Sequence, residues 1–410
     1  YTDNSSGTKS GSFNFGQRAF TYTPPTGFKA LNSANLPDPT ILLPNKHFNT
    51  LLYTGNSTDA RAITGVGFSP DWIWIKNRDD NDWNNLYDTV RGAGKRIATN
   101  STSAEHNSTD HMDSIDSDGF TLKDGDNTNQ NGEDYVSWNW NAGDTDGKTY
   151  TVTVVSDSGN KYRFDGFGTS AVTLDLAEGG TYIFNMDDAS NASHPFMIGT
   201  TANDNTTAFG SGIVYKLDGV VKTFAQYHAG FAAATTRRLE FTIPASTNNL
   251  FYFCYAHSGM GGAINTNSTL GSSNFEGNTQ ATVKVNTTAG FSIISWTSRG
   301  NSSGTYDTFG HGLGVRPNVL ILKTRSTTGN FNVYNSNFSS ANNKILQLSN
   351  NISEYTSSNY WGADNTTPSS TVVHVNQGNY SSGAGATFIM YAFSEVAGYS
   401  KFGSYTGNGS

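Results

Sequence analysis

Four residues whose side chains bind transition metals stand at a characteristic spacing in the chain. Cys254, His257 and Met260 are each three positions apart, and His194 comes earlier. Two imidazole nitrogens and a thiolate in a trigonal plane, completed by a weak axial thioether, are the ligands of a type 1 copper site. The residue types and their spacing therefore predict a copper site that could carry one electron.

The loop that carries three of these residues must turn tightly. Gly259, Gly261 and Gly262 offer the backbone freedom that so short a loop requires. Cys254 is the only cysteine, so the chain can form no internal disulfide. A lone Cys is more often a small buried hydrophobic residue than a ligand, and a degenerate domain could keep all four side chains for packing. Both interpretations stay open at the level of sequence.

The elements that must position these ligands are short strands. Alternating or continuous apolar runs within residues 148–285 indicate at least six of them. The expected strands are Tyr150–Val155, Val172–Leu176, Thr181–Met186, Leu239–Pro244, Phe251–Cys254 and Ala281–Val285. So many short strands in one segment are typical of a compact Greek-key sandwich.

This segment resembles the cupredoxins. The loop spacing is similar to that of amicyanin-like members, with one strand before the first His and another ending at Cys254. The resemblance implies that His194 and His257 are nitrogen ligands of copper, Cys254 the thiolate ligand and Met260 the axial ligand.

An extended loop, Gly199–Thr236, makes the separation between the first His and Cys254 somewhat long for this family. His228 lies in that loop and stands outside the motif.

Other candidate sites are less specific. Asp116–Gly119 and Asp124–Gly132 are similar to calcium loops. Neither has a late bidentate Glu at the right offset, and Asp-Gly and Asn-Gly pairs are ordinary turn formers. His106 and His111 lie in a polar loop without a metal-binding context. No Ser/His/Asp triad, nucleotide loop or pair of catalytic carboxylates can be assembled, so we expect no catalytic residues and no enzyme.

Four tryptophans allow two interpretations. Trp72 and Trp74, and likewise Trp138 and Trp140, are two residues apart on expected strands, so each pair faces one side of its sheet. They could pack in a core or between modules, or they could form a platform on which sugars stack.

Composition narrows the class of protein. Only 14% of the residues are charged, 13% are aromatic and 44 are Gly, which favours short strands and turns over long helices. The net charge of −8 and the lack of a basic stripe argue against nucleic-acid binding. No run of 18 apolar residues is present, so we expect no membrane span. We expect no helix longer than two turns.

Two segments of the chain repeat each other, one on each side of the cupredoxin-like segment. Gly67–Arg78 and Gly314–Arg325 both combine a Pro-containing turn with an apolar strand that ends in Lys-x-Arg. A second strand follows each, and similar closing strands end the two repeats at Tyr135–Trp140 and Phe388–Phe393. The C-terminal residues from Phe402 repeat the opening Leu52-Tyr-Thr-Gly-Asn-Ser, so they could begin a third copy.

The repeats and the residues before them resemble the β-sandwich modules of marine bacteriophage tail fibres and related virion surface proteins. Residues 14–32, Ser117–Leu122, Asn286–Trp296, Gly310–Pro317 and Phe402–Gly409 carry this resemblance. It implies five parts, in an all-β chain of tandem jelly-roll or β-sandwich modules. These are the end of an upstream SPRY-like domain with a linker (1–45), a β-sandwich module (46–147), the inserted cupredoxin-like domain (148–285), a second module (286–400) and a further repeat or tail (401–410).

The resemblance also implies a function. We expect a structural, non-enzymatic tail fibre or appendage at the virion surface, outside the cell, that contributes to host attachment. Its expected partners are other copies of itself in a homo-oligomer, other virion proteins and a host receptor, for which a glycan is one candidate. Two alternatives stay open, namely a secreted blue-copper electron-transfer protein and a bacterial surface adhesin or filament protein.

Overall fold

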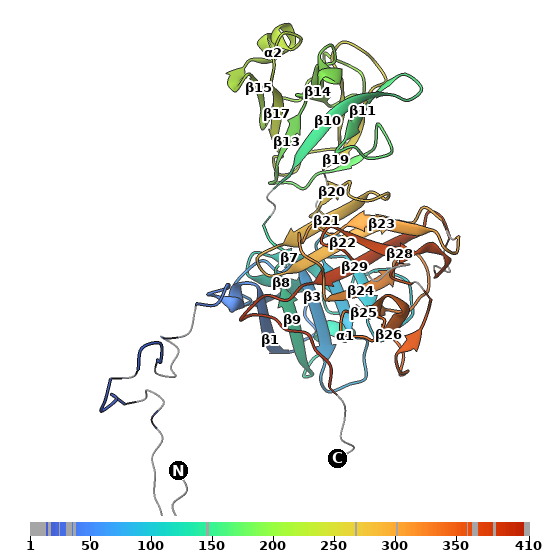
Figure 1. Cartoon of the computed structure of the whole chain (residues 1–410). Coiled ribbons are helices and arrows are strands. Elements are labelled where there is room, and N and C mark those ends of the chain that lie inside the picture. The colour runs from blue at the N-terminus through green and yellow to red at the C-terminus, as the bar shows by residue number, and fades with distance from the viewer. Residues whose placement is uncertain are drawn as a thin grey trace, which may run out of the picture.

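The chain folds into two bodies of β-strands, one standing on the other (Figure 1). The computed structural model describes residues 14, 18–23, 25–29, 35, 38–144, 147–266, 269–300, 302–358, 360–362, 368–379 and 383–405. Strands predominate throughout, which confirms the expected all-β class. Most of the expected upstream domain end (1–45) and the last five residues of the C-terminal part (401–410) lie outside the described residues.

The first sheet system, module 1, forms part of the larger body. Its main sheet has the order β1-β9-β3-β4-β5-β6. The strands are β1 (Phe48–Thr54), β3 (Trp72–Asn77), β4 (Asn85–Asp88), β5 (Lys95–Ala98), β6 (His106–Asn107) and β9 (Asp134–Trp140). A small sheet of β2 (Arg61–Thr64), β8 (Gly119–Leu122) and β7 (Met112–Asp116) covers one face. Between the two sheets lies a core that includes Ile73, Tyr87 and Phe120.

Module 2 makes up the rest of the larger body. Its main sheet has the order β20-β21-β22-β29-β24-β25-β26-β27. The strands are β20 (Ser272–Asn274), β21 (Ala281–Asn286), β22 (Phe291–Thr297), β24 (Val319–Thr324), β25 (Asn332–Asn335), β26 (Lys344–Gln347), β27 (Tyr355–Thr356) and β29 (Thr387–Phe393). The pair β23 (Tyr306–Gly310) and β28 (Val372–Asn376) closes a second core around Trp361 and Met390.

The two modules share one strand order. The order β1-β9-β3-β4-β5-β6 in module 1 matches the order β22-β29-β24-β25-β26-β27 in module 2. In both modules, the edge strand of this set pairs with the strand that comes last in the sequence, which is β9 in module 1 and β29 in module 2. Phe48 pairs with Trp140 as Phe291 pairs with Phe393. The repeat read from the sequence therefore corresponds to a repeated sheet.

The two main sheets pack back to back through an aromatic seam. Trp72 is only 3% exposed, and its ring centre lies 4.4 Å from that of Trp140 and 5.2 Å from that of Tyr391. Beside the seam, Tyr391 donates a 2.7 Å hydrogen bond to Asp88, which also holds the fully buried Arg91. Trp72 and Trp140 thus pack between modules, which is the first of the two interpretations offered by the sequence.

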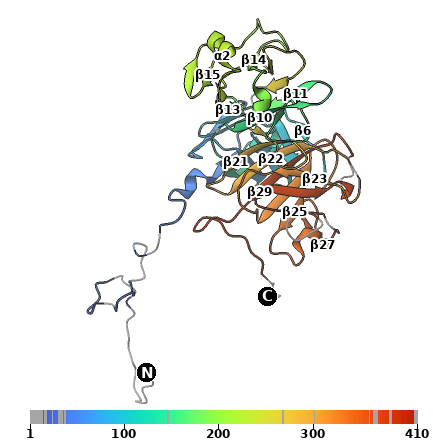
Figure 2. The same ribbon diagram turned by 45° about the horizontal axis from the view of Figure 1, so that its top comes forward.

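The inserted domain, strands β10 to β19, forms the smaller body (Figures 1 and 2). One sheet has the order β11-β10-β13-β17-β15-β16, and the other has the order β12-β19-β18-β14. The strands are β10 (Thr149–Ser156), β11 (Asn160–Phe164), β12 (Leu174–Asp175), β13 (Thr181–Asn185), β14 (Phe196–Gly199), β15 (Ile213–Leu217), β16 (Val220–Lys222), β17 (Arg237–Thr242), β18 (Leu250–Cys254) and β19 (Gly262–Asn265). Tyr162, Phe184 and Phe196 are among the fully buried side chains of their shared core.

One boundary differs from the expected one. Residues 281–285, which we assigned to the cupredoxin-like segment, form β21 and pair with β22 in module 2. Phe275, just before β21, still enters the core of the inserted domain, and Tyr150 donates a 2.9 Å hydrogen bond to the carbonyl of Ser273. The chain therefore passes from one core to the next within a few residues, where alternation alone does not reveal which sheet a strand joins.

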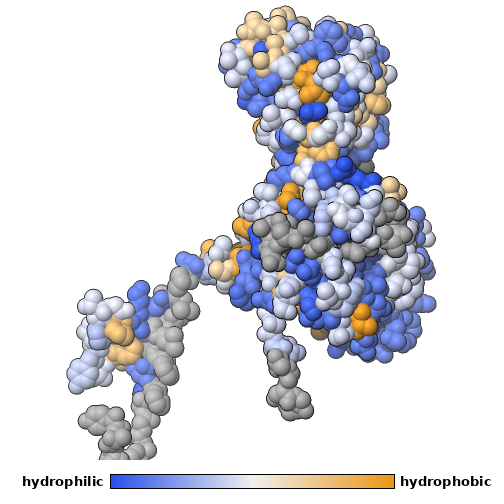
Figure 3. Space-filling model, turned by 45° about the vertical axis from the view of Figure 1, so that its right-hand side comes forward, coloured by the Kyte–Doolittle hydropathy of each residue, from blue (hydrophilic) through white to orange (hydrophobic). Residues whose placement is uncertain are grey.

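Helices are short in the described residues. α1 (Asp126–Asn129) and α2 (Phe224–Gly230) are the α-helices, and η2 (Pro44–Lys46), η3 (Ala189–Asn191), η4 (Ala341–Asn343) and η5 (Gln377–Asn379) are single 3-10 turns. In that same part of the chain, no helix is both long and apolar enough to cross a membrane. The face shown in Figure 3 is mainly polar, with apolar residues in small separate patches.

Candidate metal centre

Two neighbouring strands of the inserted domain bring the sequence-predicted ligands together. β14 and β18 are antiparallel, with Phe196 opposite Cys254. His194 lies two residues before Phe196, so the pairing places it beside the end of β18. The turn around η3 holds His194 there, because its backbone N–H donates a 2.8 Å hydrogen bond to Asn191.

The loop from β18 to β19 carries the other predicted ligands. These strands are antiparallel, with Tyr252 opposite Gly262, so the segment between them must reverse direction within a few residues. His257 and Met260 lie in this reversal. Gly259 adopts a φ of +75°, a left-handed conformation that favours glycine, and so permits the turn between the two.

Three donor atoms converge. The Nδ1 atoms of His194 and His257 are 3.1 Å apart, and the Sγ atom of Cys254 lies 3.9 Å from the first and 3.6 Å from the second. A circle through three points at these separations has a radius of about 2.1 Å. Metal–nitrogen and metal–sulfur bonds are about 2.0–2.3 Å long, so the triangle fits one transition-metal ion in its plane.

The fourth predicted ligand lies in the same core. Met260 is 1% exposed and belongs to the hydrophobic cluster that contains Cys254. Its backbone carbonyl accepts a 2.9 Å hydrogen bond from Tyr162. The axial role of its thioether stays a prediction.

Exposure differs among the predicted ligands. His194 and Cys254 are buried, whereas His257 is exposed. Burial, followed by the charge of His257, lowers the pKa of His194, which favours the neutral imidazole that binds metals. Burial also raises the pKa of the Cys254 thiol in the metal-free protein, and a bound cation would favour the thiolate. The site thus has one solvent-facing side and one dry side.

Side chains from outside the motif hold the ligand loop. Asn203 accepts a 2.8 Å hydrogen bond from the backbone N–H of Gly259, and Lys161 donates to the carbonyl of the same residue. Tyr162 donates a 2.8 Å hydrogen bond to the carbonyl of His194. No motif in the sequence identifies these residues, because Asn203 and Lys161 lie 56 and 98 positions from Gly259.

His228 approaches the loop without joining the ligands. Its ring stacks on that of Tyr255 at 3.9 Å, and both of its ring nitrogens are buried without a hydrogen-bond partner among the described residues. Burial lowers the pKa of His228 to about 4. It therefore acts as a neutral packing residue behind the loop.

The other sequence candidates have structural roles. Asp118 accepts hydrogen bonds from the backbone N–H groups of Gly65 and Gly67, so its carboxylate stabilises a turn. In the second calcium-like loop, the side-chain amide of Asn129 donates to the carbonyls of Thr58 and Lys123. Within the described ranges, the metal-binding cluster of three or more His, Cys, Asp or Glu residues consists of His194, Cys254 and His257.

The two histidines of the polar loop do not form a site together. His106 is exposed at the sheet edge. His111 is 6% exposed and lies within hydrogen-bond distance of Arg96, Ser108 and Asp110. These contacts hold the loop that contains His111 against Arg96 of β5.

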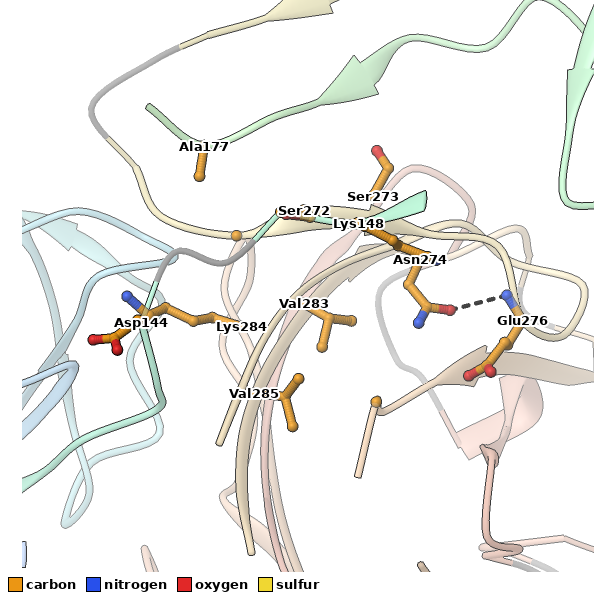
Figure 4. A pocket seen from close by; sticks show the side chains of 13 residues that line it. Asp144, Lys148, Ala177, Ser272, Ser273, Asn274, Glu276, Val283, Lys284 and Val285 are labelled. Atoms are coloured by element: carbon orange, nitrogen blue, oxygen red, sulfur yellow. Dashed lines mark hydrogen bonds between the residues drawn. The ribbon is translucent and has the colours of Figure 1, made fainter. Parts of the chain in front are cut away.

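A cleft of about 310 Å³ lies elsewhere, at the base of the inserted domain (Figure 4). Its charged lining residues include Lys148 and Lys284, whose ammonium groups lie 3.5 Å from Asp165 and 2.8 Å from Asp71 respectively. Both cations are thus neutralised by neighbouring carboxylates. None of the four predicted ligands lines the cleft.

Comparison with known proteins yields a family without a described function. No curated protein matches the chain. Residues 43–257 and 230–410 each match the family described as "Domain of unknown function (DUF7483)". The two matches begin near the start of module 1 and within the inserted domain, and together they extend over most of the chain. The chain therefore belongs to the DUF7483 family.

Proposed function

We propose that the inserted domain is a copper-binding domain of the cupredoxin type, carried by an otherwise structural, non-enzymatic protein. The observation that supports this most directly is the triangle of Nδ1, Nδ1 and Sγ atoms with sides of 3.1, 3.6 and 3.9 Å. Two imidazoles and one thiolate at such separations suit a trigonal copper site, and a buried Met260 suits the weak axial position.

Copper bound there would supply one-electron transfer between its two oxidation states. The protein's own residues have three tasks. The pairing of β14 with β18 keeps His194 beside Cys254, the hydrogen bonds to Gly259 hold the ligand loop, and the aromatic core excludes water behind Cys254. The exposed ring of His257 leaves one edge of the site open to a donor or acceptor.

The test is copper reconstitution of the full chain. We expect one tightly held copper per chain and the intense visible charge-transfer absorption of a thiolate–Cu(II) bond. Cys254→Ser should abolish the absorption. His106→Ala, which removes an exposed histidine outside the cluster, should leave it unchanged. Oxidised wild-type protein that binds no copper, or that gives the same spectrum as Cys254→Ser, would refute the proposal.

For the protein as a whole, we infer a structural role in a tail fibre or appendage at the virion surface, with host attachment as its purpose. The back-to-back pair of like modules supports this, as does a chain rich in Asn, Ser, Thr and Gly. A secreted electron-transfer protein and a bacterial adhesin or filament are the alternatives. Immunolabelling of intact particles distinguishes them, and particles that lack this chain yet adsorb normally to the host would contradict the attachment role.

A further inference from the structure

Module 1 leaves one edge of its main sheet open. β1 is an edge strand of that sheet and lies at its periphery in Figure 1. The backbone carbonyl of His47 accepts from Asn141, and the N–H of Gly55 donates to Glu133. Hydrogen-bonded positions alternate along an antiparallel strand, so the odd-numbered residues of β1 bond to β9. The backbone groups of Thr50, Leu52 and Thr54 therefore point away from the sheet.

These outward groups are largely unpaired within the part of the chain that the structure describes. The N–H of Thr50 donates to the side chain of Asn49 at 2.9 Å. β1 pairs with β9 alone, and no described residue bonds to the backbone N–H of Leu52 or Thr54. The Leu52 side chain is 66% exposed. An unpaired row of this kind is a template for a further strand.

Module 2 shows that the edge equivalent to β1 can pair with a further strand. In module 2 the equivalent strand, β22, is covered by β21, with residues 281–286 opposite 291–296. In module 1 the chain just before β1 cannot play this part. It forms the 3-10 turn η2, which begins at Pro44, and a proline has no N–H to donate. Among the described residues, module 1 thus has no strand in the position that β21 occupies in module 2.

β1 also lacks the features that protect other edges. β11 carries Lys161 and Arg163, β7 carries two aspartates and a bulge, and β6 and β27 are two residues long. By contrast, β1 has seven residues with no charge and no proline. Proteins usually blunt free edges with charges, prolines, bulges or brevity, so an unblunted edge of this length indicates a partner.

We propose that β1 pairs with β1 of a second copy of this chain, antiparallel about a two-fold axis at Leu52. The segment Thr50-Leu-Leu-Tyr-Thr54 is nearly palindromic. Centred on Leu52, the pairing places each Thr50 opposite the other copy's Thr54, and the two exposed Leu52 side chains meet. A two-fold interface requires such self-complementarity. The six-stranded main sheet of module 1 in one copy then continues into the same sheet of the other copy.

The experiment measures the mass of the full chain by sedimentation equilibrium over a concentration series, together with hydrogen exchange of the β1 amides. We expect a dimer whose Leu52 and Thr54 amides gain protection as concentration rises. Leu52→Pro removes an outward N–H without touching the β9 ladder, and Leu52→Lys brings two like charges together. Each should raise the dissociation constant at least tenfold. The control Leu42→Lys makes the same change at a leucine that is 70% exposed outside β1.

Three results would overturn the proposal. The first is a wild-type chain that stays monomeric with fast-exchanging β1 amides. The second is a dimer that both Leu52 variants leave intact, which would place the interface elsewhere. The third is protection of Leu52 and Thr54 that does not depend on concentration, because the strand would then come from the same chain. Circular dichroism confirms that each variant keeps its β-sheet content.

Discussion

The Nδ1 atoms of His194 and His257 lie 3.1 Å apart, although 63 positions separate the two residues in the chain. Two imidazole nitrogens this close either share a proton or direct their lone pairs at one cation. The Cys254 thiol lies within 3.9 Å of both nitrogens, and a thiolate prefers a soft metal ion. The three donor atoms therefore lie close enough together to hold one metal ion.

The hydrogen bond between Asn203 and Gly259 should matter for metal affinity. Asn203→Ala removes the acceptor that holds the loop between His257 and Met260, and we expect copper affinity to fall about tenfold, as is usual for residues that orient metal ligands. Competition titration against a chelator measures the change. Asn203→Asp, which keeps an acceptor oxygen, should restore most of the affinity. The control Asn248→Ala alters an exposed residue before β18. Equal losses in Asn203→Ala and Asn248→Ala would exclude a positioning role.

The buried ion pair beside the inter-module seam should contribute strongly to stability. Arg91 and Asp88 both have fully buried side chains, so Arg91→Met leaves an uncompensated carboxylate in the interior. We expect a loss of about 3–5 kcal/mol in the free energy of unfolding, measured by denaturant titration with tryptophan fluorescence.

The matched control for this prediction is Arg78→Met. Arg78 faces Asp134 at 3.9 Å with both side chains 48% exposed, so its removal should cost no more than about 1 kcal/mol. Similar denaturation midpoints for the two variants would show that the buried pair stabilises the fold no more than the exposed pair does.

His311 should make the protein sensitive to acid. It is fully buried, its Nδ1 atom accepts from Leu313 and its Nε2 atom lies 3.3 Å from the carbonyl of Ser369, so it is held neutral. Burial lowers its pKa from 6.5 to about 4. The unfolded chain therefore binds a proton between these pH values that the folded chain does not, and stability falls as the pH is lowered from 6.5 towards 4.

The size of this effect is at most about 3 kcal/mol. Thermal unfolding at several pH values measures it, and His311→Gln should flatten the dependence, whereas His106→Gln at an exposed site should not. A slope that His311→Gln leaves unchanged would assign the acid sensitivity to other groups.

Much of the fold, and the residues that meet at the candidate site, could be predicted from sequence, and the reasons are local. Tyr150, Tyr182 and Phe253 lie in strands that alternation or continuous apolar runs reveal, and the Cys254–Met260 spacing is a pattern within one loop. The two modules could be matched because Gly67–Arg78 and Gly314–Arg325 keep the same order of turn, strand and charge.

What could not be predicted depends on contacts between distant segments. The sheet that β21 joins is decided by its pairing with β22, and its own pattern of Ala, Val and Lys suits either neighbour. The residues that hold the ligand loop, Asn203 and Lys161, are ordinary polar residues until folding brings them to Gly259. Similarly, the sequence favours packing for Trp72 but leaves a sugar-stacking platform open, and only the contact with Tyr391 of module 2 decides between them.

If His194, Cys254 and His257 hold one copper ion, as we propose, a thiolate sulfur and two imidazole nitrogens surround the metal. X-ray absorption at the copper edge, recorded on the reconstituted full chain, measures these neighbours. We expect one short copper–sulfur bond and two copper–nitrogen bonds, all within about 2.0–2.3 Å, and loss of the sulfur bond in Cys254→Ser. A spectrum with nitrogen and oxygen neighbours alone, or one that Cys254→Ser leaves unchanged, would contradict the proposal.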